Sequence, residues 1–270
     1  MICFPNAKIN LGLSVLEKRT DGMHNIETCL IPISIHDVME IQPSSSFSLV
    51  QLGLPLDCNA KDNLVSKAWN LLLSVKKDIT PVRVLLYKNI PVGSGLGGGS
   101  SDASFFLKAM NSIQSLGLST AELESLAVKV GSDCPFFIKN EPAIATGIGN
   151  ILSPVNNPIQ NLYLTVVFPN LKILTTDAYG SINSRAESDL SIMIASSYVN
   201  WRNSIKNDFE EIAIEYFPKI QIIKNTLYEL GAIYVSLTGS GSAIYALSSK
   251  PLAPNIFSNE YRVWSNVLVL

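Results

Sequence analysis

The most informative stretch of the sequence is Pro91-Val92-Gly93-Ser94-Gly95-Leu96-Gly97-Gly98-Gly99-Ser100-Ser101-Asp102-Ala103. Five glycines fall within seven residues, and without Cβ atoms their backbone N–H groups can converge on an anion. Apolar residues then recur at helical spacing, which predicts a helix whose first turn Ser100 or Ser101 caps. A glycine loop that leads into a helix is typical of a phosphate site, because free N–H donors and the positive end of the helix dipole meet there.

A flexible linker and two nucleotide-binding motifs are the alternatives for this stretch. Apolar segments flank it on both sides, which favours an ordered loop over a linker. The P-loop pattern ends in Gly-Lys-Ser/Thr, and the stretch contains no lysine. Gly93, Gly95 and Gly98 have the dinucleotide spacing, but that fingerprint needs an acidic residue at a strand end about 20 residues later. Residues 118–130 have a helical pattern instead, so a dinucleotide site is disfavoured.

Length and composition bound the class of protein. The chain has 270 residues, 47% of them hydrophobic, and a net charge of −2 without a basic block. Nucleic acid is therefore not an expected partner, because phosphate backbones need a positive footprint. Four cysteines without CxxC spacing and only two histidines make a zinc site unexpected. No apolar run approaches about 18 residues and the N-terminus has no signal-peptide pattern, so we expect a cytoplasmic protein with no membrane partner.

The N-terminal third reads as strands. Apolar residues alternate over residues 7–15, so Lys8 and Asn10 project together from the opposite face; a solvated edge strand is the plain alternative. A polar turn, Asp21-Gly22-Met23-His24, follows, in which His24 is either a surface residue or a functional one. Further strands are expected at residues 28–35, 37–41, 47–52 and 82–87.

Two helices carry clear start signals before residue 131. Asp62 or Asn63 caps a helix that begins at residue 64, and Ser119-x-x-Glu122 is a capping box for a helix over residues 121–130. Asp133 follows directly, beside Pro135-Phe136-Phe137. It is either a turn residue that caps its own backbone or a carboxylate placed for function.

The second half of the chain again mixes strands and helices. Residues 154–161 are rich in Pro and Asn, which predicts a domain boundary and two domains, 1–153 and 154–270. We expect strands at 162–168, 234–245 (two, around a glycine turn) and 263–269, and helices from Thr175 and over 207–216 and 218–230. Because strands and helices do not alternate regularly, the predicted class is α+β.

Five segments together resemble one enzyme family. The glycine loop is similar to the Pro-x-x-x-Gly-Leu-Gly-Ser/Gly-Ser-Ser signature of the GHMP kinases, which are small-molecule phosphotransferases that use ATP and Mg²⁺. The others match in family order across nearly the whole chain: Pro5-Asn6-Ala7-Lys8-Ile9-Asn10-Leu11, Asp21-Gly22-Met23-His24, Gly131-Ser132-Asp133-Cys134-Pro135-Phe136-Phe137 and Leu237-Thr238-Gly239-Ser240-Gly241. The resemblance implies an N-terminal ribosomal-protein-S5-like domain and a C-terminal ferredoxin-like domain, with the active site in the cleft between them.

The resemblance also implies roles for single residues. Asp133 is the expected catalytic base, and Lys8 is its partner beside the attacking hydroxyl. A carboxylate can accept the hydroxyl proton, and a nearby ammonium keeps it ionised. Asn63 and Lys88 match positions near the adenosine, and Ser101 is the expected Mg²⁺ ligand. The ATP phosphates are expected against Pro91, Gly93, Gly95, Leu96, Gly97, Gly98, Gly99, Ser100 and Ser101.

The segments are most similar to a branch of the family whose substrate is a cytidine-diphosphate-linked alcohol of isoprenoid precursor synthesis. That similarity implies that Asn10, Asp133 and His24 face the substrate, with His24 at the cytosine edge. Met23 departs from the pattern, because an aromatic residue is usual there and a thioether covers less of a ring. The remaining expected substrate contacts are Thr175 and Tyr179 around the cytidine, and Gly239, Ser240 and Gly241 at the diphosphate.

Two other functions remain open on the sequence. One is another GHMP kinase, for homoserine, mevalonate or a sugar. The other is a nucleotide-binding homologue that has lost turnover, against which the presence of both Lys8 and Asp133 argues. The expected partners are ATP and the small-molecule substrate, and the chain is expected to be a monomer or a weak homodimer.

Overall fold

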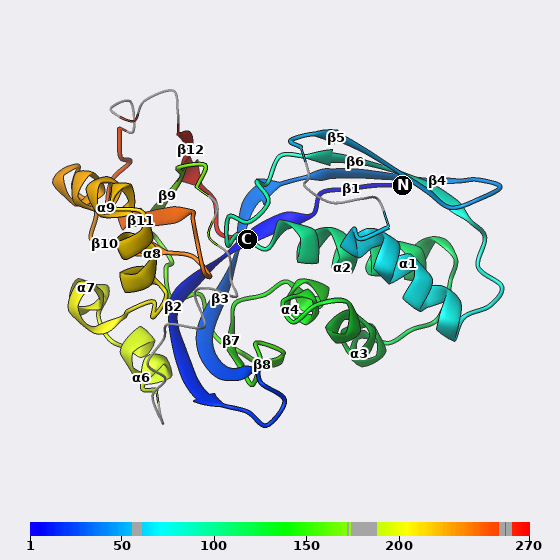
Figure 1. Ribbon diagram of the computed structural model, residues 1–270, viewed down its shortest axis with the longest axis horizontal. Helices are drawn as coiled ribbons and strands as arrows, with labels where there is room; N and C mark the ends of the chain where they lie inside the picture. Colours follow the sequence, from blue (N-terminus) through cyan, green and yellow to red (C-terminus); the bar gives the residue numbers. More distant parts are fainter. Residues whose placement is uncertain (56–60, 172, 174–187, 254–256, 258–260) are drawn as a thin grey trace. The chain divides into compact units, whose positions relative to one another are not determined.

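The computed structural model describes residues 1–55, 61–171, 173, 188–253, 257 and 261–270. The chain divides into two compact units, each built from several segments (Figure 1). Unit 1 comprises Met1–Ala7, Ile35–Val92 and Gly97–Glu141, and unit 2 comprises Lys8–Ser34, Gly93–Leu96 and Pro142–Leu270. A domain boundary between residues 153 and 154 stays a prediction.

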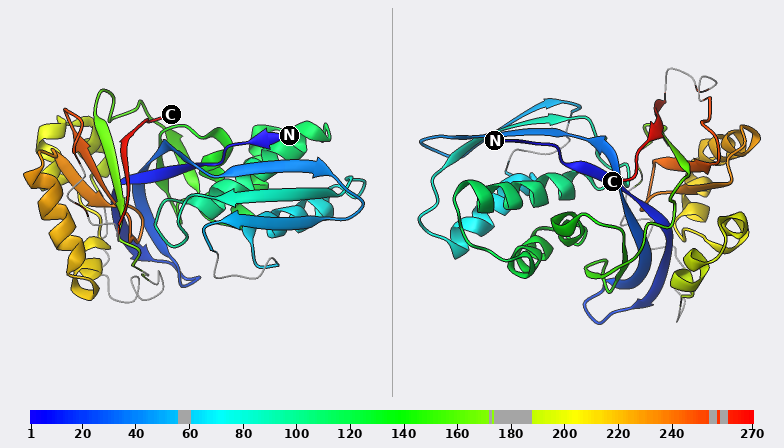
Figure 2. Two further views of the ribbon diagram at one scale, coloured as in Figure 1. Left: turned by 90° about the horizontal axis from the view of Figure 1, so that it is seen from above. Right: turned by 180° about the vertical axis from the view of Figure 1, so that it is seen from behind.

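Unit 1 is a sheet with helices packed on one of its faces. The strand order is β1-β4-β6-β5, antiparallel except for the parallel pair β5 and β6, which helix α1 connects (Figure 2). Inward-facing residues such as Val84 and Leu86 form a core with Trp69 of α1 and Phe106 of α2. The elements are β1 (Ile2–Cys3), β4 (Val38–Pro43), β5 (Ser48–Gly53), α1 (Leu64–Val75), β6 (Val82–Lys88), α2 (Gly98–Ile113), α3 (Thr120–Val130) and α4 (Cys134–Lys139).

Unit 2 holds two antiparallel sheets. The first has the order β2-β3-β7-β8, and the second has the order β10-β11-β9-β12 with α8 and α9 packed against it. That packing buries Phe209, Ile223 and Leu227 against Val235 and Ile244. The elements are β2 (Asn6–Lys18), β3 (His24–His36), β7 (Ala143–Thr146), β8 (Ile151–Pro154), β9 (Tyr163–Phe168), α6 (Leu190–Ala195), the 3₁₀ turn η1 (Tyr198–Asn200), α7 (Trp201–Ser204), α8 (Glu210–Tyr216), α9 (Lys219–Glu229), β10 (Tyr234–Leu237), β11 (Ile244–Ser248) and β12 (Arg262–Val267).

The predicted α+β class is confirmed, and so are the elements with strong local signals. Asn63 caps α1 by accepting a hydrogen bond from the Val65 N–H, and Ser119 and Glu122 form the expected capping box of α3. The short elements α4, α6, β7 and β8 were not predicted. The helix expected from Thr175 lies outside the described residues. In the described part of the chain, no helix is long and apolar enough to cross a membrane.

The prediction that Ser100 or Ser101 caps α2 is wrong. The N-cap residue is Gly97, which has a φ of 75°, in the left-handed region that glycine adopts without a steric penalty. The chain can therefore turn into the helix earlier, and the Ser101 N–H already donates to the Gly97 carbonyl oxygen at 2.9 Å. Both serines lie inside the first turns of the helix, where their hydroxyls do not serve as caps.

The plain interpretation of residues 7–15 as a solvated edge strand is also wrong. Strand β2 lies at the edge of its sheet, yet its residues from Asn6 to Val15 are all buried. Other segments cover its free edge: the Leu13 N–H donates to the Lys206 carbonyl oxygen, and the Asp208 N–H donates to the Leu13 carbonyl oxygen. The polar side chains of β2 as far as Ser14 are therefore buried in the protein.

Candidate active site

The middle of the glycine loop is held by backbone contacts within unit 2. The Ser94 carbonyl oxygen accepts from the Ala243 N–H at 3.0 Å, and the Leu96 carbonyl oxygen accepts from the Lys8 N–H at 2.9 Å. Between them, Gly95 has a φ of 77°, and a Cβ atom there would lie 1.9 Å from the Thr238 carbonyl oxygen. Only glycine fits this position, so the stretch is an ordered loop and not a linker.

A buried polar network surrounds Lys8 and Asn10, which are each 3% exposed. The Lys8 Nζ donates to the Asn10 Oδ1 at 2.6 Å, and the Asn10 Nδ2 donates to the Thr28 Oγ1 at 3.0 Å. The Thr238 Oγ1 lies 3.1 Å from the same Asn10 Oδ1 and 3.2 Å from the Gly95 carbonyl oxygen. The neutral Asn10 amide thus holds the Lys8 side chain in place.

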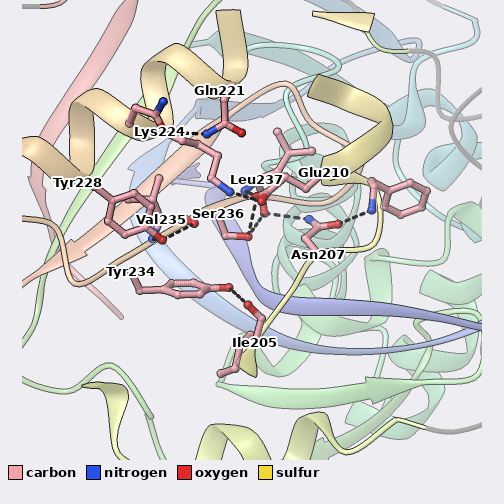
Figure 3. A network of polar contacts seen from close by, with 12 residues as sticks. Ile205, Asn207, Glu210, Gln221, Lys224, Tyr228, Tyr234, Val235, Ser236 and Leu237 are labelled. Carbon is pink, nitrogen blue, oxygen red and sulfur yellow. Dashed lines mark hydrogen bonds and ion pairs between the residues drawn. The ribbon is translucent and has the colours of Figure 1, made fainter. Parts of the chain in front are cut away.

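The turn after β10 is fixed by the residues that begin α8 (Figure 3). The Asn207 Nδ2 donates to the carbonyl oxygens of Leu237 and Gly239, both at 2.9 Å. The Glu210 Oε2 accepts from the Leu237 N–H at 3.0 Å, and its other oxygen pairs with the Lys224 ammonium. The glycine turn between β10 and β11 is therefore held by a side chain from outside the hairpin.

In unit 1, the serine-rich start of α2 lies against the segment that carries Asp133. The Ser104 Oγ donates to the Cys134 carbonyl oxygen at 2.7 Å, and a Cβ atom at Gly131 would lie 3.9 Å from the Ser100 Oγ. Asp133 occupies the N-cap position of α4, but its side chain makes no capping hydrogen bond to that helix. Asp133 therefore does not act as a side-chain cap of α4, and its role as a catalytic base stays a prediction.

Ser101 is the residue here that suits a magnesium ion. Its side chain is fully buried, and among the described residues its Oγ has no hydrogen-bond partner. The described residues contain no cluster of three His, Cys, Asp or Glu side chains that could hold a metal. Mg²⁺ keeps several waters and is usually bound through one or two protein groups together with substrate phosphates. A single buried hydroxyl at the start of α2, directly after the glycine loop, is compatible with such a site.

Lys88 lies between two buried carboxylates. Its Nζ forms ion pairs with Asp37 and Asp102, and all three side chains are buried. Burial, with a smaller contribution from the negative charge of Asp37, raises the pKa of the Asp102 carboxyl to about 8. The Lys88 charge acts in the opposite direction but does not outweigh these two effects. Burial alone would lower the pKa of Lys88, but the charges of Asp102 and Asp37 outweigh it and hold that pKa above its ordinary value. A contact of Lys88 with the adenosine stays a prediction.

The positions of the remaining expected site residues do not test their predicted ligand contacts. Asn63 is buried and serves as the cap of α1. Met23 is 52% exposed in the turn before β3, where its N–H donates to the Asp21 Oδ1 at 3.0 Å, and His24 is half-buried. Thr175 and Tyr179 lie outside the described residues. The predicted ligand contacts of these residues stay predictions.

Several residues of these networks were missed from the sequence. Thr28, Asp37, Thr238 and Asn207 bind site residues from distant parts of the chain. No local pattern marks Thr28 or Asp37. No spacing in the sequence marks Asp102 as a partner of Lys88 either.

Comparison with known proteins agrees with the two-part organisation. The family description "GHMP kinases N terminal domain" matches residues 63–141, and "GHMP kinases C terminal" matches residues 183–262. The chain is 46% identical over 258 residues to the 4-diphosphocytidyl-2-C-methyl-D-erythritol kinase of Azobacteroides pseudotrichonymphae, with 94% of this chain and 96% of that protein covered. The chain belongs to this family of GHMP kinases. It is an ATP-dependent small-molecule kinase.

Three further comparisons, one with a curated sequence and two with crystal structures, show what this GHMP kinase is similar to. It is 39% identical to the 4-diphosphocytidyl-2-C-methyl-D-erythritol kinase of Porphyromonas gingivalis, covering 99% of this chain and 100% of that protein. A crystal structure of 4-(cytidine 5′-diphospho)-2C-methyl-D-erythritol kinase superimposes with a TM-score of 0.82 at 30% identity, covering 100% of this chain and 99% of that chain. A crystal structure of mevalonate kinase shares the fold alone, with a TM-score of 0.74 at 14% identity. The predicted GHMP architecture is confirmed.

Proposed function

We propose that this GHMP kinase transfers the γ-phosphoryl group of ATP to the 2-hydroxyl of 4-diphosphocytidyl-2-C-methyl-D-erythritol, a step of the non-mevalonate route to isoprenoid precursors. The observation that carries the proposal is the identity of 39–46% to kinases of that name over nearly the whole chain. The buried Lys8 and Asn10 pair and the ordered glycine loop support it, because an inactive relative has no need to keep a desolvated ammonium in place.

The glycine loop and the start of α2 are proposed to bind the ATP phosphates. Gly97 as N-cap brings no side chain to the first turn, so its N–H groups can point at an anion. The buried Ser101 hydroxyl would hold Mg²⁺, which neutralises phosphate charge when it is bound. Catalysis of phosphoryl transfer is mainly positioning and charge stabilisation, which suits a rigid loop of this kind.

Asp133 and Lys8 are proposed as the catalytic residues. The substrate hydroxyl oxygen forms the new bond to the γ-phosphorus, the bond to the bridging oxygen of ADP breaks, and Asp133 accepts the hydroxyl proton. The Lys8 ammonium offsets the negative charge that develops at the reacting oxygens. The neutral Asn10 amide keeps that ammonium oriented without cancelling its charge.

The cytidyl end of the substrate is proposed to lie at the β2–β3 turn and the glycine turn. His24 would read the cytosine edge, and Met23 with Tyr179 would flank its ring, beside Thr175. The backbone of Gly239, Ser240 and Gly241 would approach the diphosphate. A cytoplasmic location and a monomer or weak homodimer stay predictions.

The test is a direct identification of the product. The purified full chain is incubated with ATP, Mg²⁺ and 4-diphosphocytidyl-2-C-methyl-D-erythritol, and the mixture is followed by ³¹P NMR and mass spectrometry. We expect ADP and a substrate that carries one new phosphomonoester. Homoserine and mevalonate are offered in parallel reactions. Phosphorylation of either of these, with none of the cytidyl substrate, would overturn the proposal.

A further inference from the structure

Lys88 joins parts of unit 1 that are distant in sequence. It is the last residue of β6 and is 2% exposed. Its Nζ forms an ion pair with Asp37, which stands between β3 and β4, and donates a hydrogen bond to the Oδ2 of Asp102 in α2 at 2.5 Å. Ion pairs of this kind are shorter and stronger than neutral hydrogen bonds, and the low dielectric of the interior strengthens them further.

Asp37 sets the course of the chain as it leaves β6. While its Oδ2 faces Lys88, its Oδ1 accepts the N–H groups of Asn89 at 2.5 Å and Ile90 at 2.8 Å. Both oxygens of one carboxylate are therefore used on three consecutive residues. The position of Ile90, just before the glycine loop, is fixed by this carboxylate.

The start of α2 packs on the same place. A Cβ atom at Gly98 would lie 2.8 Å from the Ile90 Cγ2 and 3.4 Å from the Lys88 Nζ. Asp102, one turn later in the same helix, binds Lys88 directly. Through Asp37, Lys88 is linked to Ile90, and through Asp102 it is linked to the start of α2. Residues 91–97 therefore run between two fixed ends.

We propose that Lys88 is a positioning residue of the ATP site, which acts by holding the two ends of the phosphate loop together and not by contact with adenosine. This inference rests on the proposed function of the loop. A glycine-rich segment loses much conformational entropy when it is ordered, so fixing its ends before ATP arrives reduces the cost of binding. The same fixed ends aim the first N–H groups of α2 at the phosphates.

The experiment compares phosphate-bearing and phosphate-free ligands in two variants. Lys88→Met removes the ammonium, and Asp37→Asn keeps the shape of the side chain while it breaks the link to Lys88 and leaves one carboxylate for one ammonium. Lys139→Met, which removes a half-exposed lysine of the same unit paired with Glu124, is the control. The dissociation constants of ADP and adenosine are measured by calorimetry and ligand-observed NMR, and the melting temperature by circular dichroism.

We expect Lys88→Met and Asp37→Asn to weaken ADP binding by about tenfold or more, with the adenosine affinity unchanged and the control like the wild type. In steady state, KM for ATP rises while KM for the cytidyl substrate does not. If Lys88→Met does not fold, Asp37→Asn decides alone, because a direct adenosine contact of Lys88 predicts little effect from it. A folded Asp37→Asn variant that binds ADP normally overturns the proposal. So does a Lys88→Met variant that loses adenosine as strongly as ADP.

Failure of the proposed function has a different signature. If the wild-type chain does not phosphorylate the cytidyl substrate, ADP affinity still reports on the loop, because that measurement involves no turnover. The positioning role of Lys88 and the identity of the substrate are therefore tested separately.

Discussion

Asn10 is the residue at which the polar contacts of unit 2 converge. Its side chain binds Lys8, Thr28 and Thr238, and its carbonyl oxygen accepts from the Tyr245 Oη at 2.8 Å. Burial raises the pKa of Tyr245 well above its ordinary value, so this phenol stays a neutral donor. Because an amide carries no charge, Asn10 orients the Lys8 side chain without forming an ion pair with it.

Asn10→Asp tests the importance of that neutrality. The carboxylate has the same shape and would stand at the position now 2.6 Å from the Lys8 Nζ, where it would form an ion pair. We expect kcat to fall by about 100-fold, the effect of removing one charge-stabilising donor, while the melting temperature does not decrease. Lys8→Met should show a similar fall in kcat. An Asn10→Asp variant with the kcat of the wild type would mean that the Lys8 charge takes no part in the reaction.

Asp133→Asn separates chemistry from binding. The amide keeps the shape of the side chain but cannot accept the hydroxyl proton. The loss expected for a general base is about 10²- to 10⁴-fold in kcat, with little change in the affinity for ADP. Quenched-flow single-turnover kinetics measures the chemical step directly. Retention of a normal single-turnover rate would exclude Asp133 as the base.

Substitutions at Gly95 and Gly93 test how rigidly the loop is held, because the two positions share a positive φ but differ in their surroundings. Both have positive φ, 77° and 66°, but a Cβ atom at Gly95 meets the Thr238 carbonyl oxygen at 1.9 Å, whereas one at Gly93 meets nothing within 4 Å. Gly95→Ala should lower the free energy of unfolding by about 2 kcal/mol or more, and Gly93→Ala by about 1 kcal/mol. Urea unfolding of both variants measures the difference. Equal losses would show that the close approach at Gly95 relaxes freely.

At the scale of elements, the segment that leads into helix α8 holds the glycine turn and strand β2 together. Asn207 reaches the turn after β10 (Figure 3). The neighbouring backbone, at residues 206 and 208, binds Leu13 of β2. One short segment therefore sets the distance between the strand that carries Lys8 and the glycine turn. Helix α8 has only seven residues and so has little stability of its own; these tertiary contacts hold it in place.

Asn207→Ala should loosen the glycine turn. It removes the side-chain donor of the Gly239 carbonyl oxygen and one of the two side-chain donors of the Leu237 carbonyl oxygen, and an unsatisfied buried acceptor costs about 1–3 kcal/mol. We expect a loss of that size in the free energy of unfolding and a higher KM for the cytidyl substrate. Tyr228→Phe is the control, since the Tyr228 Oη lies in the same network at 3.2 Å from the Val235 N and should contribute less. If the two variants are equally stable and active, Asn207 does not set the turn.

At the scale of the whole molecule, the buried group of Lys88, Asp37 and Asp102 makes stability depend on pH. The Asp102 carboxyl has its pKa raised from 3.8 to about 8 in the folded protein. Between those values the folded state binds a proton that the unfolded state has released. The free energy of unfolding must therefore fall as pH rises through this window, by at most about 1.4 kcal/mol per pH unit.

The measurement is urea unfolding between pH 5.5 and 8, by circular dichroism, for the wild type and Asp102→Asn. The asparagine keeps the shape of the protonated carboxyl but cannot titrate, so its unfolding free energy should decline less steeply with pH. Asp21 and Glu122, whose pKa values are lowered by hydrogen bonds, are already ionised throughout this range. Parallel pH profiles for the two proteins would mean that the carboxyl is ionised in the folded state.

Elements with local chemical signals were predicted well, and elements without them were not. The caps of α1 and α3 are hydrogen bonds between residues two or three apart, so Asn63, Ser119 and Glu122 could be recognised in isolation. Helix α4 and strands β7 and β8 are four to six residues long. Helix α4 and strand β7 form because their residues, such as Phe136 and Phe137, are buried by the rest of the molecule, and the mostly exposed β8 forms by pairing with β7. No local pattern expresses these tertiary contacts.

The spacing of the glycines, the capping residues and the five matching segments were enough to predict the α+β class, an ordered glycine loop and the kinase family. The binding of phosphate by that loop stays a prediction. These features are local, and each is a short run of residues whose chemistry does not depend on the remainder of the chain. Only the tertiary structure revealed which side chains bind the site residues. Asn10 meets Thr28, 18 residues away, and Tyr245, 235 residues away, and Lys88 meets Asp37, 51 residues away. Such contacts arise only when packing removes the side chains from water and makes an unpaired polar group too costly to leave.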